Sequence, residues 1–348
     1  MSRTGIGSTA PGQREMAAEV ARLFFDRQLS KVEIGGRLGI SRFRVARLID
    51  LALAEDLVRI EFRDIPPVDR DLARAIEERF GLDLCVVAGE ADGEGDGAAR
   101  AARLAGSVTG ELIRRGDVVG IAWGSTLAAV VGAIAPRHDP SIEVVQLAGS
   151  SVRLERTGDP GQISRALADR LGASHHPLLA PAFVDEPSLR SALLAQPDLA
   201  ETVAAFDRLS LAIVGIGAMP AGGSSGRSSL IRSGALSEAD VADLLARGAV
   251  GDLVVHTFDA AGRFVAPDLA ERAIAIPVDR LRRVPRVLAV AAGAEKAVAI
   301  RGALASGVVR MLVTDSGGAA AVLDDGLWAA GATGARPRKR SPTEPRPA

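Results

Sequence analysis

Between Leu84 and Thr314 the chain alternates short continuous apolar runs with stretches whose apolar residues recur at helical spacing. The apolar runs show no in–out alternation, which is the pattern of strands buried on both faces. Strands that alternate with helices build a parallel sheet covered on both sides. The sequence therefore predicts a large doubly wound, mostly parallel α/β domain, with strands expected at 84–88, 117–122, 142–147, 211–214, 253–258, 273–276, 287–291 and 309–314.

A different pattern precedes this domain, because residues 16–55 have the apolar spacing of three helices. Ser30 and Glu33 have the spacing of a capping box that starts the second helix, and Ser41 can cap the third. Two short helices joined by a glycine-containing turn predict a helix-turn-helix. The alternation of apolar and charged residues at 58–63 predicts a short strand, which would form a wing beside the helices.

Charge is distributed unevenly along the 348 residues, whose net charge is only −1. Residues 31–47 hold five basic residues and one acidic residue, a net charge of +4, whereas residues 64–330 hold 26 basic and 34 acidic residues, a net charge of −8. Dense local positive charge favours the phosphate backbone of a nucleic acid. We expect contact with double-stranded operator DNA from Lys31, Ser41, Arg42, Phe43, Arg44 and Arg47. The alternative is a solvated basic face in which Phe43 packs against a neighbouring helix.

Composition excludes several other classes of protein. The only cysteine, Cys85, lies in an apolar run, where a buried inert thiol is expected. The N-terminus lacks the apolar core of a signal peptide, and charges interrupt every apolar stretch before it could span a membrane. Four scattered histidines offer no metal-ligand spacing. We therefore expect a cytoplasmic protein with no cofactor, no metal site and no membrane partner.

Small and polar residues gather where the predicted strands end. In sheets of this kind ligands bind beyond the carboxyl ends of the strands. Glycines let the backbone approach a ligand, helix starts offer free N–H groups, and carboxylates accept from sugar hydroxyls. The mixture predicts a sugar phosphate or related sugar or polyol, bound by Gly124, Ser125, Thr126, Gly149, Ser150, Arg153, Asp252, Lys296 and Asp315. Each of these positions taken alone is also compatible with an ordinary turn, cap or surface residue.

Six stretches follow one another in a specific order: EIGGRLGISRFRVARLI, GDVVGIAWGSTLAAV, EVVQLAGS, APAFVDEPSLRSALLAQPDLAETVAAFDRLSLAIVGIG, GALSEADVADLLARGAVGDLVVHTFDAAGRFV and AVAAGAEKAVAIRGALASGVVRMLVTD. Their order resembles the SorC family of sugar-sensing bacterial transcription regulators from about residue 13 to about residue 325. The resemblance implies an effector domain similar in fold to glucosamine-6-phosphate deaminase and ribose-5-phosphate isomerase, with the loop 124–126, the turn 149–150, Asp252 and Lys296 in its pocket. It also implies a homodimer or a homotetramer. Gly35 and Gly36 depart from the family, in which an alanine-containing pair is common.

We expect five segments along the chain. Residues 1–13 and the basic tail 331–348 have the composition of disordered ends. Residues 14–63 form the helix-turn-helix domain, residues 64–80 a linker helix, and residues 81–330 the domain that binds the effector.

Two functions of different class fit this plan. The first is a DNA-binding regulator of carbohydrate metabolism that is not an enzyme, has no catalytic residue, and changes operator affinity when a sugar phosphate or polyol binds. The second is an isomerase or deaminase acting on sugar phosphates, which needs a base beside the substrate carbon. His256, close to Asp259, is the best candidate for that base. Because no acidic cluster accompanies it, we favour the regulator.

Overall fold

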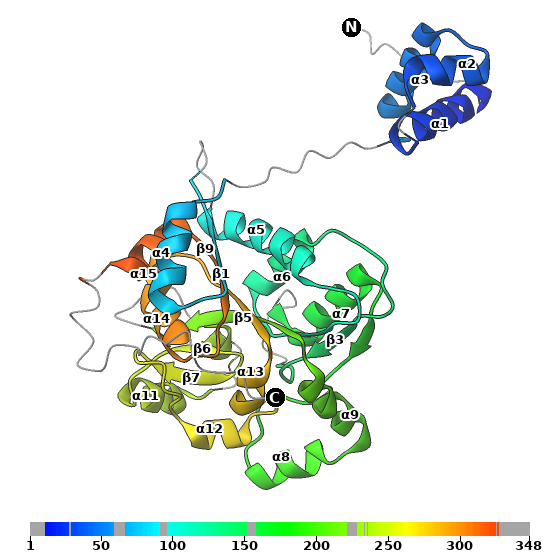
Figure 1. Ribbon diagram of the computed structural model, residues 1–348. Helices are drawn as coiled ribbons and strands as arrows, with labels where there is room; N and C mark the ends of the chain where they lie inside the picture. The colour runs from blue at the N-terminus through cyan, green and yellow to red at the C-terminus, as the bar shows by residue number, and fades with distance from the viewer. Residues whose placement is uncertain are drawn as a thin grey trace, which may run out of the picture. The chain divides into compact units, whose positions relative to one another are not determined.

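The chain consists of two compact units, Met1–Asp64 and Ile65–Ala348, and each is described by itself. Figure 1 shows the computed structural model. The structure describes residues 11–27, 29–58, 67–90, 96–151, 158–220, 228–232, 234, 236–324 and 326.

The N-terminal unit contains three described helices, α1 (Pro11–Phe25), α2 (Lys31–Leu38) and α3 (Arg42–Ala54). Helix α1 begins before the start that we expected for this unit. The three helices pack on one another because each has one apolar face, as amphipathic spacing requires. Their shared core consists of Ala17, Val20, Ala21, Ile34, Val45, Leu48, Ile49 and Ala52.

Both predicted caps are confirmed. The Ser30 backbone N–H donates to Glu33 Oε2 at 2.8 Å, and the Glu33 N–H donates to Ser30 Oγ at 3.3 Å, so α2 begins with a full capping box. The Arg44 N–H donates to Ser41 Oγ at 3.3 Å and starts α3. Between the helices Gly39 adopts φ 66°, a left-handed conformation that glycine reaches without strain. Residues 59–63 of the predicted wing lie outside the described residues.

The second unit is built on one large, mostly parallel sheet, as expected. Its strands follow the order β1-β9-β8-β5-β2-β3-β4, and every neighbouring pair along this path is parallel. A hairpin of β6 (Ala249–Leu253) and β7 (His256–Asp259) joins β5 antiparallel. The strands of the path are β1 (Leu84–Ala88), β2 (Val118–Ile121), β3 (Glu143–Gln146), β4 (Ser174–His176), β5 (Leu211–Ala218), β8 (Arg286–Val290) and β9 (Met311–Asp315).

Helices cover this sheet in two groups that Figure 1 separates. One group is α5 (Gly97–Leu112), α6 (Ser125–Ala133) and α7 (Pro160–Leu171), and the other is α4 (Arg70–Phe80), α14 (Ala297–Ala305) and α15 (Ser316–Leu323). Within the described part of the chain no helix is long and apolar enough to cross a membrane. The remaining helices are α8 (Pro187–Leu194), α9 (Pro197–Ala205), α10 (Ser229–Arg232), α11 (Glu238–Ala246), α12 (Pro267–Arg272) and α13 (Val278–Arg283).

The segment that enters the second unit is held by β1. The Asp69 N–H donates to the Val87 carbonyl at 2.9 Å, and the Gly89 N–H donates to the Pro67 carbonyl at 2.6 Å. The helix that follows, α4, packs against β1 and α15. Residues 67–80 are therefore anchored to the body of the second unit.

Three expectations about strands are corrected. The apolar run 253–258 is not one strand, because Val254 adopts φ 62° and turns the chain between β6 and β7. Residues 273–276 make only two isolated bridges, one of them between Ala148 and Ala275. The strand expected at 211–214 instead continues to Ala218, because β6 supplies a pairing partner for its second half. Local apolar patterns do not contain this tertiary information.

Candidate functional site

The predicted loop at residues 124–126 forms the open start of α6. Gly124 adopts φ 117°, and its N–H donates to the Gly158 carbonyl at 3.2 Å. None of the described side chains caps this helix start, so its first N–H groups, which point out of the helix end, have no side-chain partner among them. Ser125 is exposed and Thr126 is half-buried. This end of α6 therefore presents both backbone N–H groups and hydroxyls.

Asp252 and Lys296 form a second cluster. Asp252 lies on β6 opposite Gly217 of β5, and its side chain is only 3% exposed. Lys296 is half-buried at the end of the short helix η3 (Ala294–Lys296), which precedes α14. Within the described part of the chain, Asp252 Oδ1 accepts no hydrogen bond. A buried carboxylate oxygen without a partner costs free energy, so this acceptor is available to a hydrogen-bond donor that the described residues do not supply.

Burial opposes the charge of both members of this cluster. It raises the pKa of Asp252 to about 7, while the neighbouring Ser228 hydroxyl and the positive charge of Lys296 act in the opposite direction. Burial also lowers the pKa of Lys296, and the negative charges of Glu295 and Asp252 counter that effect. Each group is therefore the counter-charge of the other in a poorly solvated place.

Two serines connect the clusters, and the sequence reasoning did not identify them. A side-chain carbon placed on Gly124 would lie 3.1 Å from Ser229 Oγ. A side-chain carbon on Gly217 would overlap both the Asp252 carboxylate and the Ser228 side chain. Ser228 is buried, and its Oγ accepts the Ile231 N–H at 3.2 Å. Their signal in the sequence is a serine pair before a helix, the same kind of junction as 124–126.

Asp315 is close to Lys296 but is partly committed to the backbone. Its Oδ1 accepts the N–H of Gly293 at 2.9 Å and the N–H of Gly318 at 3.0 Å, so it caps α15 and fixes the loop before Lys296. It also contributes a negative charge at Lys296. Its role in the described structure is therefore to position the loop.

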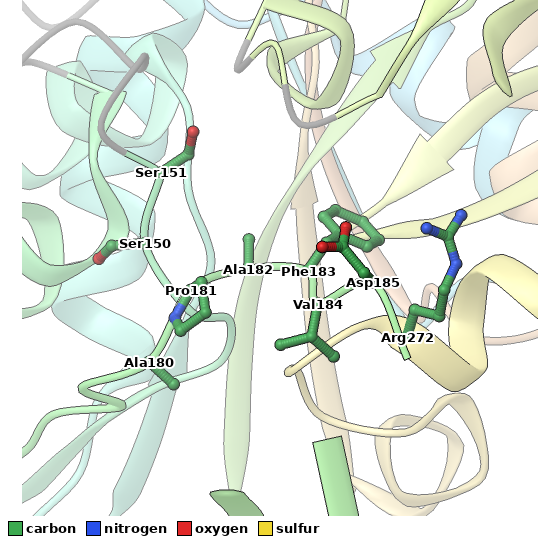
Figure 2. A pocket seen from close by; sticks show the side chains of 9 residues that line it. All are labelled: Ser150, Ser151, Ala180, Pro181, Ala182, Phe183, Val184, Asp185 and Arg272. Carbon is green, nitrogen blue, oxygen red and sulfur yellow. The ribbon is translucent and has the colours of Figure 1, made fainter. Parts of the chain in front are cut away.

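The turn after β3 faces a different part of the second unit. Gly149 is buried, and a side chain there would overlap the carbonyl groups of Ala180 and Pro181. Ser150 lines a pocket of about 420 Å³ together with residues 180–185 and Arg272. Figure 2 shows Arg272 and Asp185 at one end of this pocket, with Ser150 and Ser151 at the other. The remaining predicted residue, Arg153, lies outside the described residues.

His256 does not have the surroundings of a catalytic base. It is buried, and its Nε2 lies 2.8 Å from the carbonyl oxygen of Ile276, which can only accept a hydrogen bond. Burial lowers the pKa of His256. The carboxylate of Asp259 accepts the side-chain N–H of Arg263 at 2.7 Å. Both residues therefore hold the fold. The described residues include no group of three or more His, Cys, Asp or Glu that could hold a metal ion.

In the N-terminal unit the predicted DNA-contacting residues all lie on the surface. Lys31, Ser41, Arg42, Phe43, Arg44 and Arg47 are exposed, whereas the apolar residues of α3 are buried on its other side. The Lys31 ammonium lies 5.8 Å from the ring centre of Phe24, and the Arg42 guanidinium lies 4.9 Å from that of Phe43. Exposed basic residues therefore lie at the start of both α2 and α3.

The single cysteine is buried, as its apolar surroundings predicted. Burial raises the pKa of the Cys85 thiol to about 12, which removes the thiolate needed for reactivity.

Comparison with known proteins adds independent findings. Residues 68–324 match the family model described as "Putative sugar-binding domain". The chain is 28% identical over 316 residues to the erythritol catabolism regulatory protein EryD of Brucella abortus, covering 90% of this chain and 98% of EryD. It is 27% identical over 312 residues to the sorbitol operon regulator of Klebsiella pneumoniae, covering 86% of this chain and 95% of that protein.

Solved structures of transcriptional regulators are also similar to this chain. The full-length sorbitol operon regulator SorC from Klebsiella pneumoniae superposes with a TM-score of 0.67 at 25% identity, covering 90% of this chain and all of SorC. A domain of a possible sugar-binding transcriptional regulator from Arthrobacter aurescens TC1 superposes with a TM-score of 0.64 at 26% identity, covering 76% of this chain and 100% of that domain.

Proposed function

The chain belongs to the SorC family of sugar-binding transcriptional regulators, and we propose how its residues divide the work of such a regulator. It is a transcriptional regulator of carbohydrate metabolism rather than an enzyme, since the relatives that it matches over nearly their whole length are regulators. The N-terminal unit binds operator DNA in the cytoplasm, and the second unit binds a sugar phosphate or related polyol that controls the affinity for DNA.

The effector site that we propose lies between the start of α6 and the Asp252–Lys296 cluster. The single observation that supports it best is the buried Asp252 Oδ1, which accepts no hydrogen bond from the described residues. A sugar hydroxyl would supply the missing donor. The ammonium of Lys296 and the uncapped N–H groups beside Ser125 and Thr126 would hold a phosphate, because helix starts and cations both favour anions.

The other residues predicted from the sequence have supporting roles in the proposed effector site. Asp315 orients the loop of Lys296, and Gly124 lets the ligand approach the start of α6. Ser150 stays a proposed effector contact from the pocket that it lines after β3, while Gly149 holds the turn beneath it. Arg153 remains a candidate for a phosphate contact.

A thermal-shift screen of the full chain tests the effector proposal. The panel is a set of sugar phosphates and polyols, with erythritol, sorbitol and their phosphates included because relatives are named for regulating the use of those polyols. A ligand at one hundred times its Kd stabilises the folded state by about 2.7 kcal/mol. Asp252→Ala should abolish the shift of the best compound. A shift that persists unchanged in that variant would place the ligand elsewhere.

For DNA we propose a helix-turn-helix in which α3 is the recognition helix, with residues 58–63 as a wing. The support is the pair of capped helices joined by a left-handed glycine, together with the exposed basic residues at the start of α2 and α3. Readers of this kind bind as symmetric dimers on paired half-sites, so we propose a homodimer or a homotetramer. Effector binding would then change the arrangement of the subunits and so the affinity for paired half-sites.

A further inference from the structure

Phe43 is exposed to an unusual degree for an aromatic residue in a regular helix. It is the second residue of α3, and its side chain is 66% exposed. It is absent from the apolar cluster that joins the three helices, although Phe24 and Phe25 of α1 both pack there. The alternative considered from the sequence, that Phe43 packs against a neighbouring helix, is therefore wrong.

The charges around the ring indicate which kind of partner this surface suits. The Arg42 guanidinium lies over the ring at 4.9 Å from its centre, a cation–π contact that favours this position of the side chain. Arg44 and Arg47 are exposed on the same helix, on the side away from its buried residues. An apolar ring surrounded by positive charge suits a partner that is polyanionic but presents apolar groups between its charges. Duplex DNA has this property, because thymine carries a 5-methyl group into the major groove.

We propose that Phe43 reads the 5-methyl group of a thymine in each operator half-site, with Arg42 fixing the ring. This inference rests on the proposed DNA-binding function. It goes beyond that function by assigning Phe43 a base preference rather than a contact with the phosphate backbone. The ring has no hydrogen-bonding group, so it cannot bind a phosphate, and contact with a methyl group is the base-specific interaction open to it.

The test begins with the full chain and a random duplex library, from which bound sequences are selected. Each dT of the selected site is then replaced in turn by deoxyuridine, which removes only the methyl group. Burial of one methyl group corresponds to about a fourfold change in affinity. We expect one thymine per half-site at which this replacement weakens binding by the wild-type chain about fourfold. Phe43→Ala and Phe43→Gln should bind the dT and deoxyuridine duplexes equally.

A matched control variant accompanies this test, and three results would overturn the proposed contact with the thymine methyl group. Val32→Ala removes another exposed apolar side chain of the same unit, 65% exposed, and should keep the methyl preference. If deoxyuridine has no effect at any position for the wild type, the inference is wrong. A penalty that is unchanged in both Phe43 variants also overturns it. A wild-type chain that selects no sequence at all would refute the proposed DNA-binding function itself, and the inference with it.

Discussion

The carboxylate of Asp315 accepts a hydrogen bond of 2.9 Å from the backbone N–H of Gly293, which ties the end of β9 to the loop after β8. The same oxygen caps α15, whose helix packs against η3 and α4. Lys296 follows Gly293 by three residues, so the position of its ammonium depends on this bond. One carboxylate therefore sets the geometry of the proposed effector site from outside its centre.

Asp315→Ala removes both hydrogen bonds and should destabilise the second unit by about 2 kcal/mol, since a helix cap and a loop hydrogen bond contribute about 1 kcal/mol each. Asp315→Asn keeps an acceptor oxygen in place and should recover more than half of the loss. Urea unfolding of the second unit measures both variants. Equal destabilisation by Ala and Asn would show that the negative charge, rather than the hydrogen bonds, is what stabilises this loop.

The stability of the protein should depend on pH through Asp252. Its folded pKa of about 7 lies above the ordinary value of 3.8, so folding favours the protonated form. The stability that this proton supplies is complete below about pH 4 and is lost as the pH rises to about 7. A shift of about three units corresponds to roughly 4 kcal/mol. Asp252→Asn cannot ionise.

The wild type should therefore lose stability relative to Asp252→Asn as the pH rises from 4 to 7, and the difference should persist at pH 8. The measurement is the difference in unfolding free energy between the two proteins across this range. Ser228→Ala provides a control, because its hydroxyl lowers the Asp252 pKa and its loss should move the transition to higher pH. A difference that does not change with pH would contradict a raised pKa.

Lys296→Ala should weaken a phosphorylated effector about 10- to 100-fold, because a hydrogen bond to a charged group contributes about 1.5–3 kcal/mol. The unphosphorylated parent compound should lose less than threefold. The matched control is Val298→Ala. Val298 lies on α14 and is 43% exposed, so this variant should bind both compounds as the wild type does. Equal losses for the two compounds, measured by calorimetry, would mean that the lysine contacts no phosphate.

Arg44→Ala and Arg47→Ala should each weaken DNA binding without unfolding the N-terminal unit, since both side chains are exposed. Removing one cation from a DNA phosphate reduces the slope of log K against log salt by about 0.9. Arg22 is an exposed arginine of α1, so Arg22→Ala tests whether the loss of any positive charge has this effect. If the Arg22 variant changes the slope as much as the others, the basic face of α3 is not the specific contact.

Gly35 and Gly36 should respond differently to alanine although they are neighbours in α2. A side-chain carbon on Gly35 would lie 2.7 Å from the Ile40 carbonyl oxygen, so the turn would have to move, whereas nothing lies within 4 Å of one on Gly36. Gly36→Ala should stabilise the unit by up to about 1 kcal/mol through helix propensity. Gly35→Ala should be less stable than Gly36→Ala in thermal unfolding. Equal gains for both would show that the turn adapts freely.

Features decided by local chemistry could be predicted from the sequence. The caps at Ser30 and Ser41 depend on side chains three residues from their partners, and strand β1 was predicted with its observed bounds, Leu84–Ala88. The parallel sheet followed from buried strands that alternate with helices. In each case the deciding interactions are short in sequence or repeated many times.

Features decided by distant partners could not be predicted. The turn at Val254 has the composition of a strand, and it becomes a turn where β6 pairs with both β7 and β5. Ser228 and Ser229 become site candidates because β5 and the start of α6 bring them beside Asp252 and Gly124. The spacing of these residues along the sequence does not indicate that Ser228 lies beside Asp252 or that Ser229 lies beside Gly124.

The most direct test of the central claim measures the affinity of the full chain for its selected duplex while the best compound of the thermal-shift panel is titrated. Coupling between two sites typically amounts to 1–3 kcal/mol, which is about a 5- to 150-fold change in affinity. We predict a change of at least fivefold that Asp252→Ala abolishes. An affinity for DNA that stays constant while the compound demonstrably saturates the protein would contradict a ligand-controlled regulator.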